Sequence, residues 1–142
     1  MSIDAEILAE RVAAVDRHLA RVAAKLPASA SELLPNSDAS DAVILHLWQA
    51  TQIVLDTALG VCARLKLGTP RGYGDAFVRL QNAGVIEPAL ARRLVAATGF
   101  RNVVAHAYES IDLARVHRAA TDGPADLWAF LAAVRDRALS AG

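Results

Sequence analysis

The feature that most constrains the fold is a run of apolar residues at helical spacing that begins near Asp38 to Asp41 and continues to Leu67. Intervals of three, four and seven residues place these side chains on one face of an α-helix. Gly68, followed by Pro70, predicts the end of that helix. A helix of nearly thirty residues spans about 40 Å, so we expect the other elements to pack around it. The apolar positions are Ile44, Leu47, Trp48, Val54, Leu55, Leu59, Cys62 and Leu65.

The same spacing predicts further helices on both sides of this segment, and no stretch has the alternating pattern of a strand. We expect residues 27–40 to form a loop, and Asp122-Gly123-Pro124 to break the C-terminal helical region in two. The chain is therefore predicted to be one all-α domain over residues 1–142, an up-and-down bundle of four to six helices. The other expected helices run from a cap at Ser2 to about Pro27, between the turns at 71–74 and 82–84, from Glu87-Pro88 through Tyr108, and onward from Ser110 or Asp112.

Composition supports helices and excludes several classes of protein. Hydrophobic residues make up 54% of the 142 residues but aromatic ones only 5%, which favours closely packed helices over a sheet sandwich. Fifteen basic and fifteen acidic residues cancel, so any contact with RNA has to come from a local patch. A single cysteine, Cys62, suits a reducing cytoplasm and is expected to be a small buried hydrophobe. We expect neither a signal peptide nor a membrane-spanning segment.

The most unusual chemistry lies in residues 101–108, where Arg101, Asn102, His106 and Tyr108 interrupt an aliphatic segment. On a continuous helix, Arg101 and Tyr108 share one stripe, and Asn102 and His106 share the next. Arg101 and His106 are separated by about 140° of rotation and about 7.5 Å of rise. They are therefore not expected to hold one small group from the same face, and a second copy of the helix would close the gap.

These residue types suit proton transfer and the binding of phosphate oxygens, which need no metal. His106 can accept or give a proton at cellular pH. Arg101 can donate paired hydrogen bonds to phosphate oxygens and stabilise the charge of the transition state. Asn102 is expected either to orient the phosphate or to hold a fold contact. Without a wider match, a structural ion pair or a satisfied core position explains Arg101 and His106 as well.

Other candidate features leave alternatives open. His46, Gln49, Gln52 and Asp56 are read as surface or interhelical contacts, or as lining of the active groove. Tyr73 is expected to be a packing residue rather than a platform for base stacking. The sequence contains no paired Glu-x-x-His motifs, no phosphate-binding glycine loop and no nucleophile elbow. A locally basic group could be solvated charges or a phosphate-binding patch: Arg92, Arg93, Arg101, Arg115, His117 and Arg118.

The pattern Arg-x4-His-x-Tyr, with Gly99-Phe100 before it and Ile111-Asp112 after it, resembles the signature of the HepT family in the HEPN superfamily of helical ribonucleases. The resemblance covers most of the chain from about Leu47 onward, and it implies a HEPN-type helical bundle. Gly99 is expected to let another backbone approach the site. The upstream matches are Leu67-Gly68-Thr69-Pro70, Tyr73, Phe77, Leu80 and Gly84-Val85-Ile86.

The resemblance implies a function in which Arg101 and His106 are catalytic. It implies a homodimer in which two copies of the motif form one composite site, and a role as the ribonuclease toxin of a toxin–antitoxin pair. The implied partner is a minimal nucleotidyltransferase of the MntA type, which transfers AMP to Tyr108; no cofactor or metal is implied. Two alternatives are a non-catalytic helical adaptor for a nucleotidyltransferase and a nucleotide-binding subunit.

Overall fold

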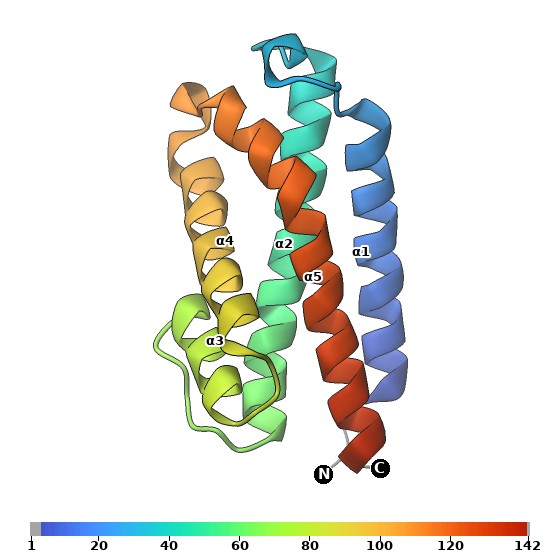
Figure 1. Ribbon diagram of the computed structural model, residues 1–142, viewed down its shortest axis with the longest axis vertical. Coiled ribbons are helices and arrows are strands. Elements are labelled where there is room, and N and C mark those ends of the chain that lie inside the picture. Colours follow the sequence, from blue (N-terminus) through green and yellow to red (C-terminus); the bar gives the residue numbers. More distant parts are fainter. Residues whose placement is uncertain (1–3, 142) are drawn as a thin grey trace.

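A computed structural model describes residues 4–141, with side chains described as far as residue 138. The described chain is all-α, as predicted, and its long helices run up and down beside one another (Figure 1). Two short 3-10 turns, η1 (Ala30–Glu32) and η2 (Tyr108–Ser110), lie between helices. The α-helices are α1 (Ala5–Lys25), α2 (Asp38–Arg64), α3 (Tyr73–Asn82), α4 (Pro88–Ala107) and α5 (Leu113–Ala141).

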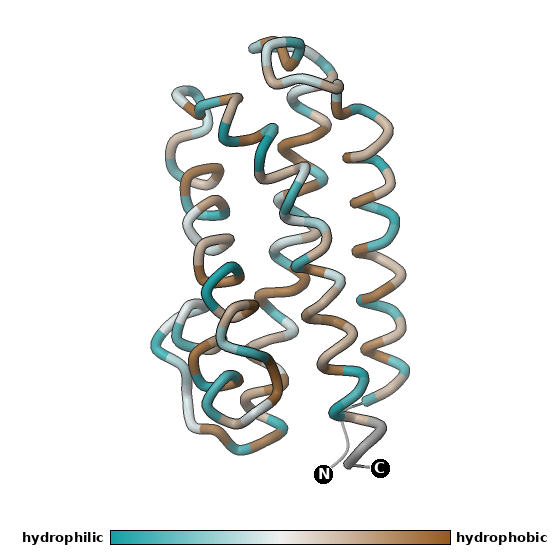
Figure 2. The backbone as a smooth tube through the Cα atoms, in the orientation of Figure 1, coloured by the Kyte–Doolittle hydropathy of each residue, from teal (hydrophilic) through white to brown (hydrophobic). Residues whose placement is uncertain are grey.

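The long helix α2 contacts each of the other α-helices, as expected from its apolar face. Twelve of its residues are buried, including Leu47, Val54 and Cys62. By length and composition α2 could cross a membrane, but half of its most apolar window is buried inside the bundle, as in the core helix of a globular protein. Figure 2 shows apolar and polar positions alternating along the helices, which is the pattern of helices with one buried side.

The limits of α1 and α2 differ slightly from those predicted. Ser2 lies outside the described residues, and Asp4 caps α1 by accepting from the backbone N–H groups of Glu6 and Ile7. Helix α2 starts at Asp38 as predicted but ends at Arg64, three residues before Leu67. The reason is that Lys66 adopts a positive φ of 56°, which a right-handed helix excludes.

A pair of histidines joins α1 to α2. The Nδ1 atoms of His18 and His46 lie 3.0 Å apart, a distance that requires one ring to donate and the other to accept. Burial, the proximity of the two rings and the neighbouring Arg17 and Arg21 lower the pKa of His18; burial and Arg21 lower the pKa of His46. His46 is therefore an interhelical contact, one of the two roles that its sequence position suggested.

The predicted break at Asp122-Gly123-Pro124 is wrong, because α5 continues through Pro124. Proline in a helix interior removes a hydrogen bond and costs about 3 kcal/mol. Here the helix buries apolar residues on both sides of the proline, Val116 and Ala120 before it and Leu127 after it. Their burial offsets that cost, and α5 bends along its length rather than ending (Figure 1).

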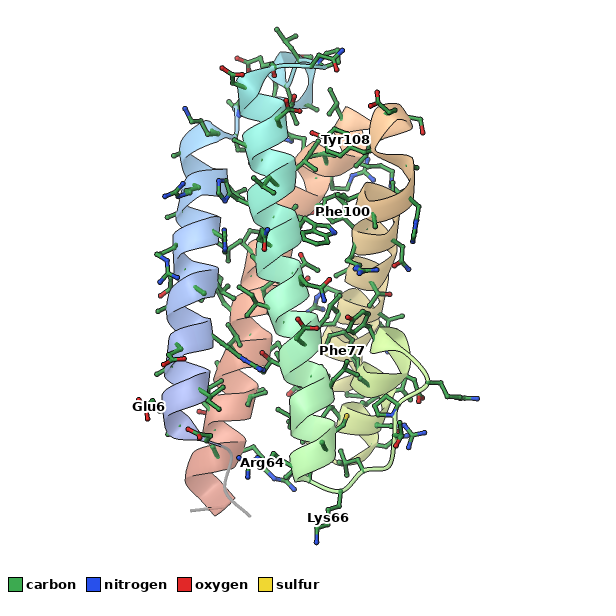
Figure 3. All side chains as sticks on the ribbon, turned by 180° about the vertical axis from the view of Figure 1, so that it is seen from behind. Glu6, Arg64, Lys66, Phe77, Phe100 and Tyr108 are labelled. Carbon is green, nitrogen blue, oxygen red and sulfur yellow. The ribbon has the colours of Figure 1, made fainter. Side chains whose placement is uncertain are left out.

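The lower half of the bundle is held by an aromatic pair between α3 and α5. Phe77 and Phe130 are both fully buried, and their ring centroids lie 5.5 Å apart in an edge-to-face arrangement. The thiol of Cys62 is buried close by and contacts the carbonyl of Ala76, and burial raises its pKa. Cys62 is thus a buried small residue, as predicted. Figure 3 shows Phe77 between α3 and α2.

Phe77→Ala is expected to lower the free energy of unfolding by about 3–5 kcal/mol, because it removes a fully buried ring and leaves a cavity against Phe130. The matched control is Val78→Ala on the same helix, where the side chain is 43% exposed and little should change. Urea denaturation followed by circular dichroism measures both variants. Equal losses in the two would contradict the central role of the aromatic pair.

Candidate active site

The segment 101–108 does not stay within one helix. At Ala107 the backbone leaves the helical region, with φ −142° and ψ 37°, and Tyr108 begins the η2 turn. The chain has to reverse here to reach α5, whose first turn is capped by Asp112 through the N–H of Ala114. The prediction that Arg101 and Tyr108 share one helical stripe is therefore wrong, and the two side chains point to different parts of α2.

Arg101 is held against α2 and α3 by three contacts. Its Nε donates to Oε1 of Gln52 at 2.9 Å, and its Nη1 donates to Oδ1 of Asn102 at 3.2 Å. Its guanidinium carbon lies 5.6 Å from the centroid of the Tyr73 ring, within the range of a cation–π contact. A guanidinium carries five N–H donors, so some donors of Arg101 stay available for an anion.

The groups that hold Arg101 are themselves connected. The Nε2 group of Gln52 donates to Oδ1 of Asp56 and to the hydroxyl of Tyr73, both at 3.0 Å. The Tyr73 hydroxyl also lies 3.4 Å from the same Asp56 oxygen. These bonds fix the Gln52 amide so that its oxygen faces Arg101. Gln52 and Asp56 therefore support the candidate site, and Tyr73 packs beneath the arginine.

His106 and Asn102 lie on the exposed face of α4, together with Val95 and Gly99. These four positions recur at intervals of four, three and four residues, so they form one stripe of the helix. A Cβ added at Gly99 would meet no atom of this chain within 4 Å, so the close approach expected there is not made within one chain. Among the residues that the structure describes, the Asn102 side chain hydrogen-bonds with Arg101 alone, which favours an orienting role over a contact between helices.

Tyr108 turns toward the N-terminal end of α2 (Figure 3). Its hydroxyl donates to Oδ1 of Asp41 at 2.6 Å, a short bond of the kind that a charged acceptor makes. This hydrogen bond, with burial and the negative charges of Asp41 and Glu109, raises the pKa of Tyr108 to about 12. The residue is nevertheless 42% exposed.

A shallow groove between α2 and α4 begins at the Tyr108–Asp41 pair. The other side chains that line it are uncharged: Ile44, Leu45, Trp48, Val104 and Ala105. Along α2, Asp41 and Gln52 are eleven residues apart, which corresponds to about 16 Å. Asp41 therefore lines this groove, whereas Gln52, the contact point of Arg101, lies further along α2 and does not line it.

The basic group noted in the sequence is divided by the fold. Arg93, Arg115 and Arg118 line a separate cavity of about 320 Å³ between α2, α4 and α5, where Arg93 pairs with Asp126 at 2.8 Å. His117 instead contacts the carbonyl oxygen of Pro27 at 2.9 Å. Arg101 does not line this cavity. A single continuous basic patch around the motif is thus not formed.

The sequence assigns no function to two residues of the site. It indicates Asp41 only as part of a helix start, because the contact of Asp41 with Tyr108 spans 67 residues of the chain. It predicts Tyr73 as a packing residue. Among residues 4–141, no three His, Cys, Asp or Glu side chains lie close enough to hold a metal ion.

Comparison with known proteins decides the family. The family described as "Ribonuclease HepT-like" matches residues 5–134, which is nearly the whole chain. The chain belongs to the HepT-like ribonuclease family. A curated relative, the mRNA nuclease HepT of Shewanella oneidensis, is 25% identical over 108 residues, covering 76% of this chain and 80% of the relative. The tRNA nuclease HepT of Aphanizomenon flos-aquae is 31% identical over 62 residues, covering 44% of this chain and 42% of the relative.

Solved structures agree on the HepT-like fold. A crystal structure of a toxin–antitoxin with AMP-PNP matches with a TM-score of 0.83 and 21% identity, covering 92% of this chain and 98% of the other. The tri-AMPylated HEPN toxin of Shewanella oneidensis in complex with MNT antitoxin matches with a TM-score of 0.81 and 23% identity, covering 92% and 97%. The predicted HEPN-type bundle is confirmed.

The hydrogen bond between Tyr108 and Asp41 predicts a pH-dependent contribution to stability. A raised pKa means that folding favours the neutral phenol, so the contribution is complete below the ordinary value of 10 and is lost as the pH rises through about 12. The difference in unfolding free energy between wild type and Tyr108→Phe should therefore be constant near neutral pH and shrink above pH 10. Urea denaturation over this range measures it, and a difference that does not change with pH would contradict the bond.

Proposed function

We propose that this chain is the RNA-cleaving toxin of a toxin–antitoxin pair, with Arg101 and His106 as its catalytic residues and Asn102 in support. The observation that carries the proposal is the way in which Arg101 is held. Its guanidinium is fixed by Gln52, Asn102 and Tyr73 but keeps unused donors, in a chain of a ribonuclease family. A fixed cation with free donors is suited to an oxyanion that develops charge during a reaction.

The two residues divide the chemistry of RNA cleavage between them. The ribose 2′-oxygen attacks the adjacent phosphorus, and the bond from phosphorus to the 5′-oxygen breaks. His106 takes the 2′-hydroxyl proton or supplies the proton to the leaving 5′-oxygen. Arg101 donates hydrogen bonds to the phosphate oxygens while their charge increases. A guanidinium and an imidazole together cover charge stabilisation and proton transfer, so we propose that cleavage does not depend on a metal.

The proposed active form is a homodimer. Arg101 is turned inward toward α2 and α3, whereas His106 lies on the exposed stripe of α4 with Val95 and Gly99. Val95 is 37% exposed and Gly99 leaves the backbone uncovered, so another helix can pack closely on this stripe. A second copy that packs there would bring its own Arg101 and His106 to the same cleft, which removes the geometric problem seen within one chain.

His106→Ala and Arg101→Ala are each expected to abolish RNA cleavage. His106 is exposed, and its side chain makes no hydrogen bond or ion pair with the described residues, so its variant should keep the wild-type unfolding free energy. Arg101→Ala should also lower stability, by about 1 kcal/mol, because Gln52 loses its donor and Tyr73 its packing partner. Gel analysis of RNA cleaved by the purified proteins, with and without a chelator, measures activity.

A composite site can be tested more strictly with a mixture of the His106→Ala and Arg101→Ala variants. If one site uses groups from both subunits, mixing the two inactive variants should restore part of the wild-type activity, because mixed dimers contain an intact arginine and an intact histidine. Light scattering should show a dimer at micromolar concentration. Cleavage by either single variant at the wild-type rate would refute the catalytic assignment, and a wild type that cleaves no RNA would favour the non-catalytic adaptor.

We further propose that the partner is a nucleotidyltransferase of the MntA type and that it transfers AMP to Tyr108. Two of the similar solved structures are toxin–antitoxin assemblies, one with AMP-PNP and one with an AMPylated toxin. In this chain Tyr108 is 42% exposed, and it lines the groove between α2 and α4. These features support Tyr108 as the acceptor.

The groove suggests how such a modification would inhibit cleavage. The phosphate attached to Tyr108 would lie near Asp41, about 16 Å along α2 from the contact point of Arg101. The phosphate itself is thus too distant to pair directly with Arg101 unless η2 moves. The sugar and base, however, can extend along the apolar groove past Leu45 and Trp48 toward Arg101. We propose that inhibition works by covering the cleft.

Tyr108→Phe should escape inhibition, because it removes the acceptor oxygen and keeps the ring. The measurement is the ratio of cleavage rates with and without prior incubation with the partner and ATP. This ratio should fall for wild type and stay near one for Tyr108→Phe. Intact-mass spectrometry provides the matching readout, since an equal adenylyl adduct on both proteins would place the modification elsewhere.

A further inference from the structure

We infer that the Asp41 carboxylate is the general base for transfer of the adenylyl group to Tyr108, so that the toxin chain itself supplies the group that activates its acceptor hydroxyl. The inference rests on the proposed modification of Tyr108. It goes beyond that proposal because it assigns a catalytic role to a residue of α2 that is 67 positions away from Tyr108 in the chain.

The geometry directs the phenolic proton of Tyr108 toward the Asp41 carboxylate. The Tyr108 hydroxyl donates to Oδ1 of Asp41 at 2.6 Å, within the range required of a general base. Asp41 is exposed in the first turn of α2, and it makes no other side-chain hydrogen bond among the described residues. The carboxylate is thus not committed to another partner. Tyr108 is 42% exposed, so ATP held by a partner enzyme has access to this residue.

The reaction requires a proton acceptor. The Tyr108 oxygen attacks the α-phosphorus of ATP and forms a new oxygen–phosphorus bond, while the bond from the α-phosphorus to the bridging oxygen breaks and pyrophosphate leaves. The phenolic proton passes to the Asp41 carboxylate. A carboxylate that accepts a hydroxyl proton during attack on a phosphate is the arrangement that protein kinases use for their substrates. ATP and its metal are supplied by the nucleotidyltransferase.

The surroundings of the Tyr108 hydroxyl disfavour its phenolate at neutral pH. The hydrogen bond to Asp41, burial and the nearby negative charges raise the pKa of the phenol to about 12, so very little phenolate forms spontaneously. The other charged group near the hydroxyl is Glu109 in η2, which also opposes formation of the phenolate. The remaining groove residues from α2 and α4 are uncharged. These groups therefore favour removal of the phenolic proton during the attack on the α-phosphorus rather than before it.

A purely structural role for Asp41 is the competing explanation. Asp38 and Asp41 are both acidic residues of the first turn of α2, where negative charge stabilises a helix. The bond to Tyr108 could also serve only to position the hydroxyl. Asparagine separates these possibilities, because its amide oxygen can still accept the Tyr108 hydrogen bond but is a very poor proton acceptor. Asp38→Asn is the matched control for loss of a first-turn charge.

The experiment measures adenylyl incorporation from labelled ATP into the full-length chain, under single-turnover conditions with excess nucleotidyltransferase. Asp41→Asn should slow incorporation by about 10²-fold at neutral pH, the usual size of a general-base contribution. Asp41→Glu should recover part of the rate, and Asp38→Asn should match wild type. The ratio of wild-type to Asp41→Asn rates should fall as the pH rises, because the variant depends on phenolate that forms in solution. Circular dichroism verifies that each variant is folded.

Each outcome bears on one claim. If Asp41→Asn is modified as fast as wild type, or is slowed by a factor that pH and Asp41→Glu leave unchanged, Asp41 is not the base, and Tyr108 can still be the acceptor. If Asp38→Asn is slowed as much as Asp41→Asn, the effect comes from the helix end and the inference also fails. If wild type acquires no adduct, the proposed modification fails, and the inference fails with it.

Discussion

Burial of α2 is the constraint on which the rest of this structure depends. The helix contacts each of the other α-helices, and twelve of its residues are removed from solvent. Among its remaining polar residues, His46 contacts α1, whereas Asp41, Gln52 and Asp56 contact residues of η2, α4 and α3. Asp41 lies near the start of the helix, and Gln52 and Asp56 lie further along it. The contact points of Tyr108 and Arg101 are thus set by the register of a single helix.

The contacts of Arg101 explain how a long, flexible side chain can be placed precisely. An arginine loses about 2 kcal/mol of side-chain entropy when it is held in one position. Here the bonds to Gln52 and Asn102 and the ring of Tyr73 offset that loss before any substrate arrives. Gln52 is itself held by Asp56 and Tyr73. The donors that remain are then available to an anion without further rearrangement, which is the condition for electrostatic stabilisation of a transition state.

The two proposed roles, cleavage at Arg101 and its control at Tyr108, are separated along α2. Arg101 is anchored about 16 Å along α2 from the carboxylate that binds Tyr108. The turn η2 contributes to this separation, because it directs Tyr108 away from the stripe that Arg101 occupies. The proposed modification of Tyr108 would therefore act on the groove between α2 and α4 and not on the guanidinium. Similar toxin chains of known structure share this bundle at 21–23% identity, so the fold is retained while most side chains differ.

The sequence alone determined the elements that depend on local and periodic information. The apolar spacing of α2 predicted the central helix, and the pattern from Arg101 to Tyr108, with its flanking residues, predicted the family that the comparisons confirm. Periodicity reports which residues are buried, and this is why the all-α class and most helix limits were predicted correctly.

Only the tertiary structure decided the features that arise from contacts between distant residues. The local sequence around Pro124 predicts a break in the helix, but burial of Val116, Ala120 and Leu127 keeps α5 continuous. Sequence spacing predicts that Tyr108 lies in the last turn of α4, but the chain reversal places it in η2 against Asp41. Gln52 could be assigned to the Arg101 site only once α2 and α4 were packed together. In each case the deciding energy comes from a partner many residues away, which local propensity and spacing do not encode.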